Sequence, residues 1–187
     1  MNKTAYAFLA TGFEEVEALS VIDILRRAGI NIKMVSITNE KLVTGSHGIG
    51  IMADLTFNDI EDTNVDLLFL PGGMPGTTNL SSHEGLCKML TKHYEDGKHL
   101  AAVCAAPSVL GKLGFLKGKK ATCFPGFEDT LTGANVLTSD RTVRSVTDGN
   151  VTTSRGMGTS IDLGLELVKV LIDENTAHEL ALTTQTI

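Results

Sequence analysis

Short, almost wholly apolar segments alternate with longer amphipathic stretches along this chain, and the alternation limits the folds it can adopt. Residues 65–70, for example, are apolar at five of six positions and stop at Pro71. Strands that are apolar on both faces are typical of parallel sheets covered by helices on each side. The order of the segments therefore predicts an α/β fold with a mostly parallel central sheet.

The expected elements follow from hydrophobic periodicity and from glycine and proline positions. The predicted strands cover residues 6–10, 30–38, 65–70 and 100–103, with shorter ones at 121–124, 142–146 and 150–153. The predicted helices cover residues 14–28, 83–96, 105–113, 159–172 and 175–182, and the glycine-rich stretch 39–54 predicts a hairpin or small excursion.

Composition narrows the class of protein. The 187 residues are 42% hydrophobic and 20% charged, which is ordinary for a globular chain, and we expect one domain over residues 1–187. The net charge is −6 and no block of basic residues exists, so nucleic acid and anionic membranes are not expected partners. We also expect no membrane span and no signal peptide. The three cysteines suit a reducing compartment, so we expect a cytoplasmic protein.

Three turns follow predicted strands, at residues 11–14, 71–73 and 104–106. Ligands of parallel α/β sheets bind outside the carboxyl ends of the strands. These turns could therefore converge on one site.

Cys104 lies where an apolar strand passes into a helix with almost no loop. A thiol there would sit beside the positive end of the helix dipole, which predicts a lowered pKa and a nucleophilic thiolate. Alanines on both sides would allow a sharp turn, as at a nucleophile elbow. The alternative is a buried core cysteine, and from position alone the two readings are about equally supported.

Two further features could support chemistry at Cys104. Glu14, Glu15 and Glu17 open the first helix, where they either complement its dipole or send one carboxyl inward to exchange a proton with the thiol. Periodicity fits both Glu15 and Glu17. Gly72 and Gly73 could expose backbone N–H groups that stabilise a negative charge, although Pro-Gly-Gly can also be a simple turn.

The remaining candidates favour structural roles. Cys87, in the middle of a predicted helix, is expected to pack there. Cys123 could be a second redox-active thiol, but packing is the favoured role for it as well. The five histidines are scattered, so no metal site is expected, and no phosphate-binding glycine loop is present.

Several stretches together are similar to one family. They are 12–17 (Gly-Phe-Glu-Glu-Val-Glu), 26–30 (Arg-Arg-Ala-Gly-Ile), 70–73 (Leu-Pro-Gly-Gly), 102–107 (Ala-Val-Cys-Ala-Ala-Pro) and 153–159 (Thr-Ser-Arg-Gly-Met-Gly-Thr). In order and spacing they resemble the ThiJ/PfpI superfamily, in the branch of the Parkinson-associated deglycase and its bacterial YajL-like relatives. The resemblance covers essentially the whole chain.

The resemblance implies a flavodoxin-like (class I glutamine amidotransferase-like) three-layer sandwich, usually a homodimer, without a cofactor. It implies Cys104 as nucleophile and Glu17, rather than Glu15, as the carboxyl bonded to it. Gly73 and Ala105 would supply backbone N–H groups. Gly72 and Ala106 would support the turns.

For function, the resemblance implies protection against stress, with glyoxalase or deglycase action on small reactive carbonyls. The alternative is a non-catalytic redox sensor or chaperone that works through oxidation of Cys104. Peptidase members carry a histidine directly after the cysteine, where this chain has Ala105, so peptidase or amidase activity is less expected. Phe124, before Pro125, stands where another branch has a histidine, which weakens the case for efficient glyoxalase turnover.

Overall fold

The computed structural model describes residues 3–137 and 142–187. The strands of the main sheet are β1 (Thr4–Leu9), β2 (Asn31–Ser36), β5 (Leu55–Thr56), β6 (Leu67–Leu70), β7 (His99–Val103), β10 (Ser145–Asp148) and β11 (Val151–Ser154). Two small pairs are formed by β3 (Leu42–Thr44) with β4 (Gly50–Met52) and by β8 (Lys120–Ala121) with β9 (Asn135–Val136). The helices are α1 (Glu15–Arg27), α2 (Gly76–Ser82), α3 (Glu84–Glu95), α4 (Pro107–Lys112), α5 (Ser160–Leu171) and α6 (Glu174–Thr183), with 3₁₀ turns η1 (Phe57–Asp59), η2 (Glu128–Thr130) and η3 (Met157–Thr159).

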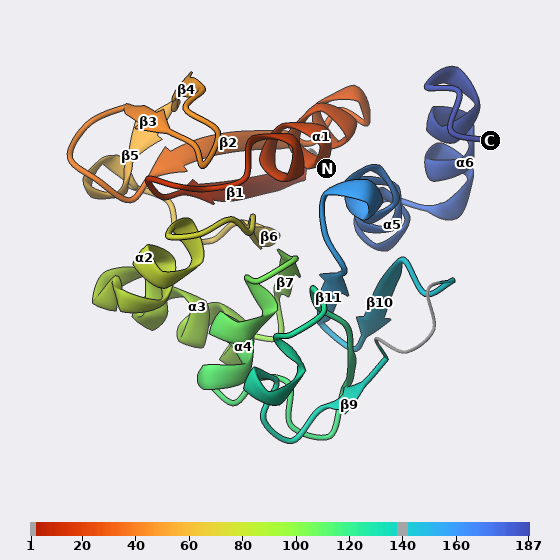
Figure 1. Ribbon diagram of the computed structural model, residues 1–187. Helices are drawn as coiled ribbons and strands as arrows, with labels where there is room; N and C mark the ends of the chain where they lie inside the picture. The colour runs from red at the N-terminus through yellow and green to blue at the C-terminus, as the bar shows by residue number, and fades with distance from the viewer. Residues whose placement is uncertain (1–2, 138–141) are drawn as a thin grey trace.

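The main sheet has seven strands in the order β10-β11-β7-β6-β1-β2-β5, with helices on both faces (Figure 1). Neighbouring strands run parallel, except β10, which pairs antiparallel with β11. The predicted α/β fold with a mostly parallel sheet is confirmed.

Strand β1 illustrates why the central strands are apolar throughout. Tyr6 and Phe8 contribute to the core beneath α2, α3 and α4, whereas Ala7 and Leu9 contribute to the core beneath α1, α5 and α6. Successive side chains of a strand point to opposite faces, and here both faces are covered. Within the described residues, no helix is long and apolar enough to cross a membrane.

Some expected boundaries are wrong. The helix expected from residue 105 begins only at Pro107, because the chain first makes a turn at residues 104–106. Helix α2 was not expected, since its sequence is rich in glycine, threonine and serine. The strand expected at 142–146 is β10, shifted because the two-residue turn at Gly149 and Asn150 sets its pairing with β11. The expected hairpin within 39–54 is present as β3 and β4.

The three turns that could converge according to the sequence do meet, at the carboxyl ends of β1, β6 and β7. The N–H of Glu14 donates to the carbonyl oxygen of Gly72 at 2.9 Å, and the N–H of Gly76 donates to that of Gly12 at 3.1 Å. The turns after β1 and β6 are therefore joined by backbone bonds, and Cys104 follows the neighbouring strand β7.

Candidate active site

Cys104 is held in an unfavourable backbone conformation at the end of β7. Its φ is 62°, which non-glycine residues rarely adopt. Its N–H donates to the carbonyl oxygen of Ser154 at 3.0 Å, and its own carbonyl accepts from the N–H of Phe124 at 2.8 Å. Such a conformation costs about 1–3 kcal/mol and clusters at functional sites, so the position is consistent with the predicted elbow.

Glu17 reaches Cys104 from helix α1. Its side chain is hydrogen-bonded to the Cys104 sulfur, and its Oε2 accepts the N–H of Gly72 at 2.9 Å. The N–H of Met157 also donates to this carboxyl. Glu17 is 1% exposed. The helix is oriented by its N-cap, because Glu14 accepts the N–H of Glu17 at 2.6 Å.

The other expected site residues lie around the sulfur. The N–H groups of Gly73 and Ala105 both donate to Cys104, as the motif implies. The N–H of Gly72 donates to the Glu17 carboxyl instead. Ala106 is fully buried, and its N–H donates to the carbonyl of Val103 at 3.0 Å, so its contribution is to the turn.

Gly72 is required for space at this site. A Cβ at this position would lie 2.5 Å from Oε2 of Glu17 and 2.7 Å from Cβ of Cys104. Gly73 has a φ of 90°, and its Cβ would lie 2.4 Å from the backbone nitrogen of Glu14. The two glycines therefore allow the three turns to approach closely.

The titration of the pair differs from the expectation of an acidic thiol. Burial, together with the charge and hydrogen bond of Glu17, raises the pKa of Cys104 to about 12, although the N–H groups of Gly73 and Ala105 act in the opposite direction. The dipole argument fails because the first helical residue is Pro107 and the sulfur lies against a carboxyl. Burial raises the pKa of Glu17 to about 7.

Because the two groups are hydrogen-bonded, their protons belong to the pair. The first proton leaves at about pH 7 and the second only far above it. At neutral pH about half of the pairs thus hold two protons, and the other half hold one proton between carboxyl and sulfur. Backbone N–H groups face each partner, so negative charge can be accommodated on either.

Glu15, the other carboxyl that periodicity allowed, faces the β3–β4 hairpin. It accepts the N–H of His47 at 2.8 Å and the Nδ1 of His47 lies 3.0 Å away. Burial opposes ionisation of Glu15, but these bonds and the N–H of Ile49 lower its pKa to about 2. Carboxylate oxygens of Glu14 and Glu15 and a ring nitrogen of His47 lie within 4.8 Å of one another. These contacts hold the β3–β4 hairpin against α1.

Two residues of the site were not singled out from sequence. A Cβ on Gly156 would lie 3.3 Å from Phe124 and 3.9 Å from both the Cys104 sulfur and Glu17. Met157 supplies its N–H to Glu17. Both residues lie in the 153–159 stretch, which contributed to the family resemblance but did not indicate a role for either of them. Phe124, which stands where another branch has a histidine, is exposed beside Cys104.

The other two cysteines differ from Cys104. Cys87 is half-buried on α3, its Sγ lies 3.6 Å from the Ser81 carbonyl oxygen, and burial raises its pKa. Cys123 is fully buried, which raises its pKa to about 12. Neither has a carboxyl bonded to its sulfur in the described chain, in keeping with the packing roles expected for them.

Comparison with known proteins agrees with this geometry. The DJ-1/PfpI family matches residues 3–170. Protein DJ-1 homolog B of Arabidopsis thaliana is 39% identical over 92% of the chain, which spans only 39% of that relative's length. Deglycase PfpI of Pyrococcus furiosus is 33% identical over 87% of the chain and 95% of its own length. The crystal structure of Drosophila melanogaster DJ-1beta superposes with a TM-score of 0.93 and 31% identity, covering 99% of this chain and 98% of that one. This chain belongs to the DJ-1/PfpI family.

Proposed function

We propose that the chain is a cysteine-dependent protein that protects against reactive carbonyl compounds, with modest glyoxalase- or deglycase-type activity through Cys104 and Glu17. The observation that carries the proposal is the hydrogen-bonded pair, in which a partly exposed sulfur lies against a buried carboxyl with a pKa of about 7. A carboxyl with a pKa near the working pH both takes and gives protons efficiently. The name of the Pyrococcus relative, a deglycase, supports the same class of substrate.

With a small α-oxoaldehyde, the sulfur of Cys104 attacks the aldehyde carbon, and the carbonyl electron pair moves to oxygen, which takes the proton held by the pair. The product is a hemithioacetal. Glu17 then removes the proton from that carbon, and the resulting enediol is reprotonated at the neighbouring carbon to give a thioester. Water hydrolyses the thioester to a 2-hydroxy acid and restores the thiol.

Phe124 sets the expected rate. An imidazole at this position would add a second proton carrier beside the sulfur, and a positioned proton carrier contributes about 10²–10⁴-fold. The exposed Phe124 offers none. Glu17 then carries every proton transfer, which supports modest turnover.

The test is consumption of methylglyoxal by the wild type and by Cys104→Ser, Glu17→Gln and Cys87→Ser. We expect no activity above the blank for Cys104→Ser and a loss of at least about 10²-fold for Glu17→Gln, since it removes the proton carrier. Cys87→Ser is the matched control and should retain full activity. Equal activity in wild type and Cys104→Ser, or an inactive wild type, would end the enzyme proposal.

A redox sensor or chaperone is the second candidate. Two observations favour it: Cys104 is partly exposed, and among the described residues Glu17 is the one side chain that is hydrogen-bonded to its sulfur and can carry a proton. Two molecules of peroxide would each transfer one oxygen to the Cys104 sulfur and leave as water, giving a sulfinic acid. Intact mass spectrometry after mild peroxide treatment, followed by fragmentation, would locate the two added oxygens. Oxidation at Cys104 without methylglyoxal turnover favours the sensor, and oxidation elsewhere counts against it.

Peptidase activity receives less support, because Ala105 rather than histidine follows the cysteine.

We also propose a homodimer in the cytoplasm. Exposed apolar side chains on α1 (Val16 and Leu19) and on α5 (Ile161) support a surface for a second copy. Sedimentation velocity should give the mass of two chains, and a monomeric mass at all concentrations would contradict the dimer.

A further inference from the structure

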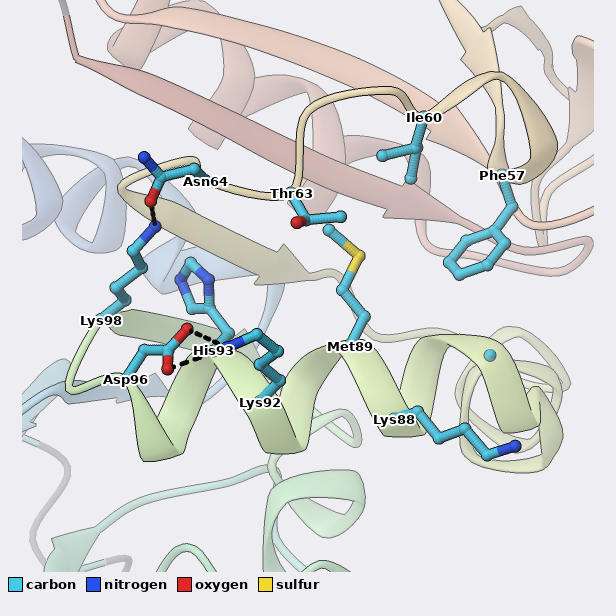
Figure 2. A pocket seen from close by; sticks show the side chains of 11 residues that line it. Phe57, Ile60, Thr63, Asn64, Lys88, Met89, Lys92, His93, Asp96 and Lys98 are labelled. Carbon is cyan, nitrogen blue, oxygen red and sulfur yellow. Dashed lines mark hydrogen bonds and ion pairs between the residues drawn. The ribbon is translucent and has the colours of Figure 1, made fainter.

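A pocket of about 500 Å³ lies between helix α3 and the segment that leads from η1 to β6. Figure 2 shows Phe57 and Ile60 on the segment side and Met89 extending from α3 toward Thr63. Phe57, Ile60 and Met89 are half-buried and pack on the core. Seven of the eleven lining residues are polar or charged, but most of the exposed lining surface is apolar.

The pocket is separate from the candidate active site. Its lining residue Lys98 directly precedes β7, whereas Cys104 directly follows the other end of that strand. Five strand residues span about 16 Å. A ligand in the pocket would therefore bind at the opposite edge of the sheet from the reactive sulfur.

The charged groups around the pocket are mostly cationic. Lys88, Lys92 and Lys98 line it, against the single carboxylate of Asp96. Lys92 and Asp96 pair with each other at 2.9 Å. The ammonium group of Lys98 donates to the neutral amide oxygen of Asn64. Within residues 3–137 and 142–187, no carboxylate lies within ion-pair distance of Lys88 or Lys98.

His93 does not contribute a polar contact to a ligand. It is buried, and its Nε2 lies 3.0 Å from the carbonyl oxygen of His99, within hydrogen-bond distance. Its ring thus forms part of the wall. The polar groups at this end of the pocket are therefore the ammonium of Lys98, the amide of Asn64 and the Lys92–Asp96 pair.

We propose that this pocket binds a small apolar molecule carrying one carboxylate. Small-molecule sites are typically 300–1,000 Å³ and mostly apolar, with polar groups that orient the ligand. This pocket matches them in volume and in its mostly apolar exposed surface. The apolar body would rest on Phe57, Ile60 and Met89. The carboxylate would take the place of the amide oxygen of Asn64 at Lys98, because a charged acceptor bonds more strongly than a neutral one.

The test compares naphthylacetate with its neutral amide, naphthylacetamide, in titrations followed by backbone amide NMR shifts. We expect the acid to shift amides of η1, residues 60–64 and α3, and to leave those of Gly72 and Ala105 unmoved. It should bind roughly two- to five-fold more tightly than the amide, which is the range that one surface ion pair allows. Equal affinity of acid and amide, shifts centred on Ala105, or no shifts with either probe would overturn the proposal.

Two variants locate the contacts. Lys98→Ala should weaken binding of the acid roughly two- to five-fold and leave binding of the amide unchanged. Lys120→Ala, which removes an exposed lysine on β8, should change the binding of neither probe. Met89→Trp should fill the pocket and abolish binding of both probes. Lys98 is only half-buried, so its variant decides the question even if Met89→Trp fails to fold. Unchanged binding of the acid to Lys98→Ala would refute the assigned contact.

Discussion

Replacing Glu17 by glutamine keeps the shape of the side chain and removes its charge. Burial raises the pKa of Glu17 to about 7 from an ordinary value of 4.5. Between these values the folded protein holds a proton that the unfolded chain has lost, so stability falls as pH rises. The contribution of protonated Glu17 to the stability of the fold is fully present below about pH 4.5 and lost by about pH 7.

The size of the effect follows from the shift. One pKa unit corresponds to about 1.4 kcal/mol, so the change from 4.5 to about 7 corresponds to about 3 kcal/mol of unfolding free energy. Glutamine can still accept the N–H of Gly72, with a loss of about 1 kcal/mol because the bond is no longer charge-assisted. We therefore expect Glu17→Gln to be more stable than wild type by roughly 1–3 kcal/mol at about pH 8, and no more stable at about pH 4.

The assay is urea unfolding followed by circular dichroism, since the chain contains no tryptophan for fluorescence. Glu40→Gln, at an exposed position after β2, is the control for removing one negative charge. Its unfolding free energy should depend on pH in the same way as that of the wild type. If the unfolding free energy of Glu17→Gln also follows that of the wild type between about pH 4 and pH 8, the Glu17 carboxyl is not desolvated and the reasoning is wrong.

Three further predictions test other parts of the structure. Gly72→Ala should abolish methylglyoxal turnover, because the added methyl lies 2.7 Å from Cβ of Cys104, whereas Gly158→Ala, with nothing within 4 Å, should not. Burial lowers the pKa of His99 to about 4 from 6.5, so neutral His99 contributes stability above about pH 6.5 that is lost as the pH falls toward 4. In thermal unfolding, His99→Gln should therefore lose less stability than the wild type over this pH range. Phe124→His should raise turnover about ten-fold or more by supplying a proton carrier, and unchanged kcat would remove that explanation.

Much of the fold could be predicted because its determinants are local. The apolar residues of β1 occupy both faces, which only a covered sheet satisfies, and Gly29 follows α1 with a φ of 79°, as expected for a helix end. Helix α2 escaped prediction because its polar sequence is stabilised by tertiary contacts of Leu80 and Thr77, which are buried.

At the site, the position of Cys104 was readable from sequence but its environment was not. Glu15 and Glu17 lie about 200° apart on the helix, and periodicity alone could not choose the inward one. The choice depends on partners distant in sequence, since His47 bonds Glu15 and Gly72 bonds Glu17. The raised pKa of Cys104 likewise depends on burial against Glu17, which no local pattern encodes.

The most direct test concerns the proton shared by Glu17 and Cys104. Carboxyl carbon NMR of selectively labelled Glu17 reports its ionisation as pH is changed. We predict a midpoint near 7 in the wild type, and one that stays well above 4.5 in Cys104→Ser, because burial is the largest cause of the shift. A midpoint near 4.5 in the wild type would mean that water solvates this carboxyl, and the proposed acid–base pair would then be contradicted.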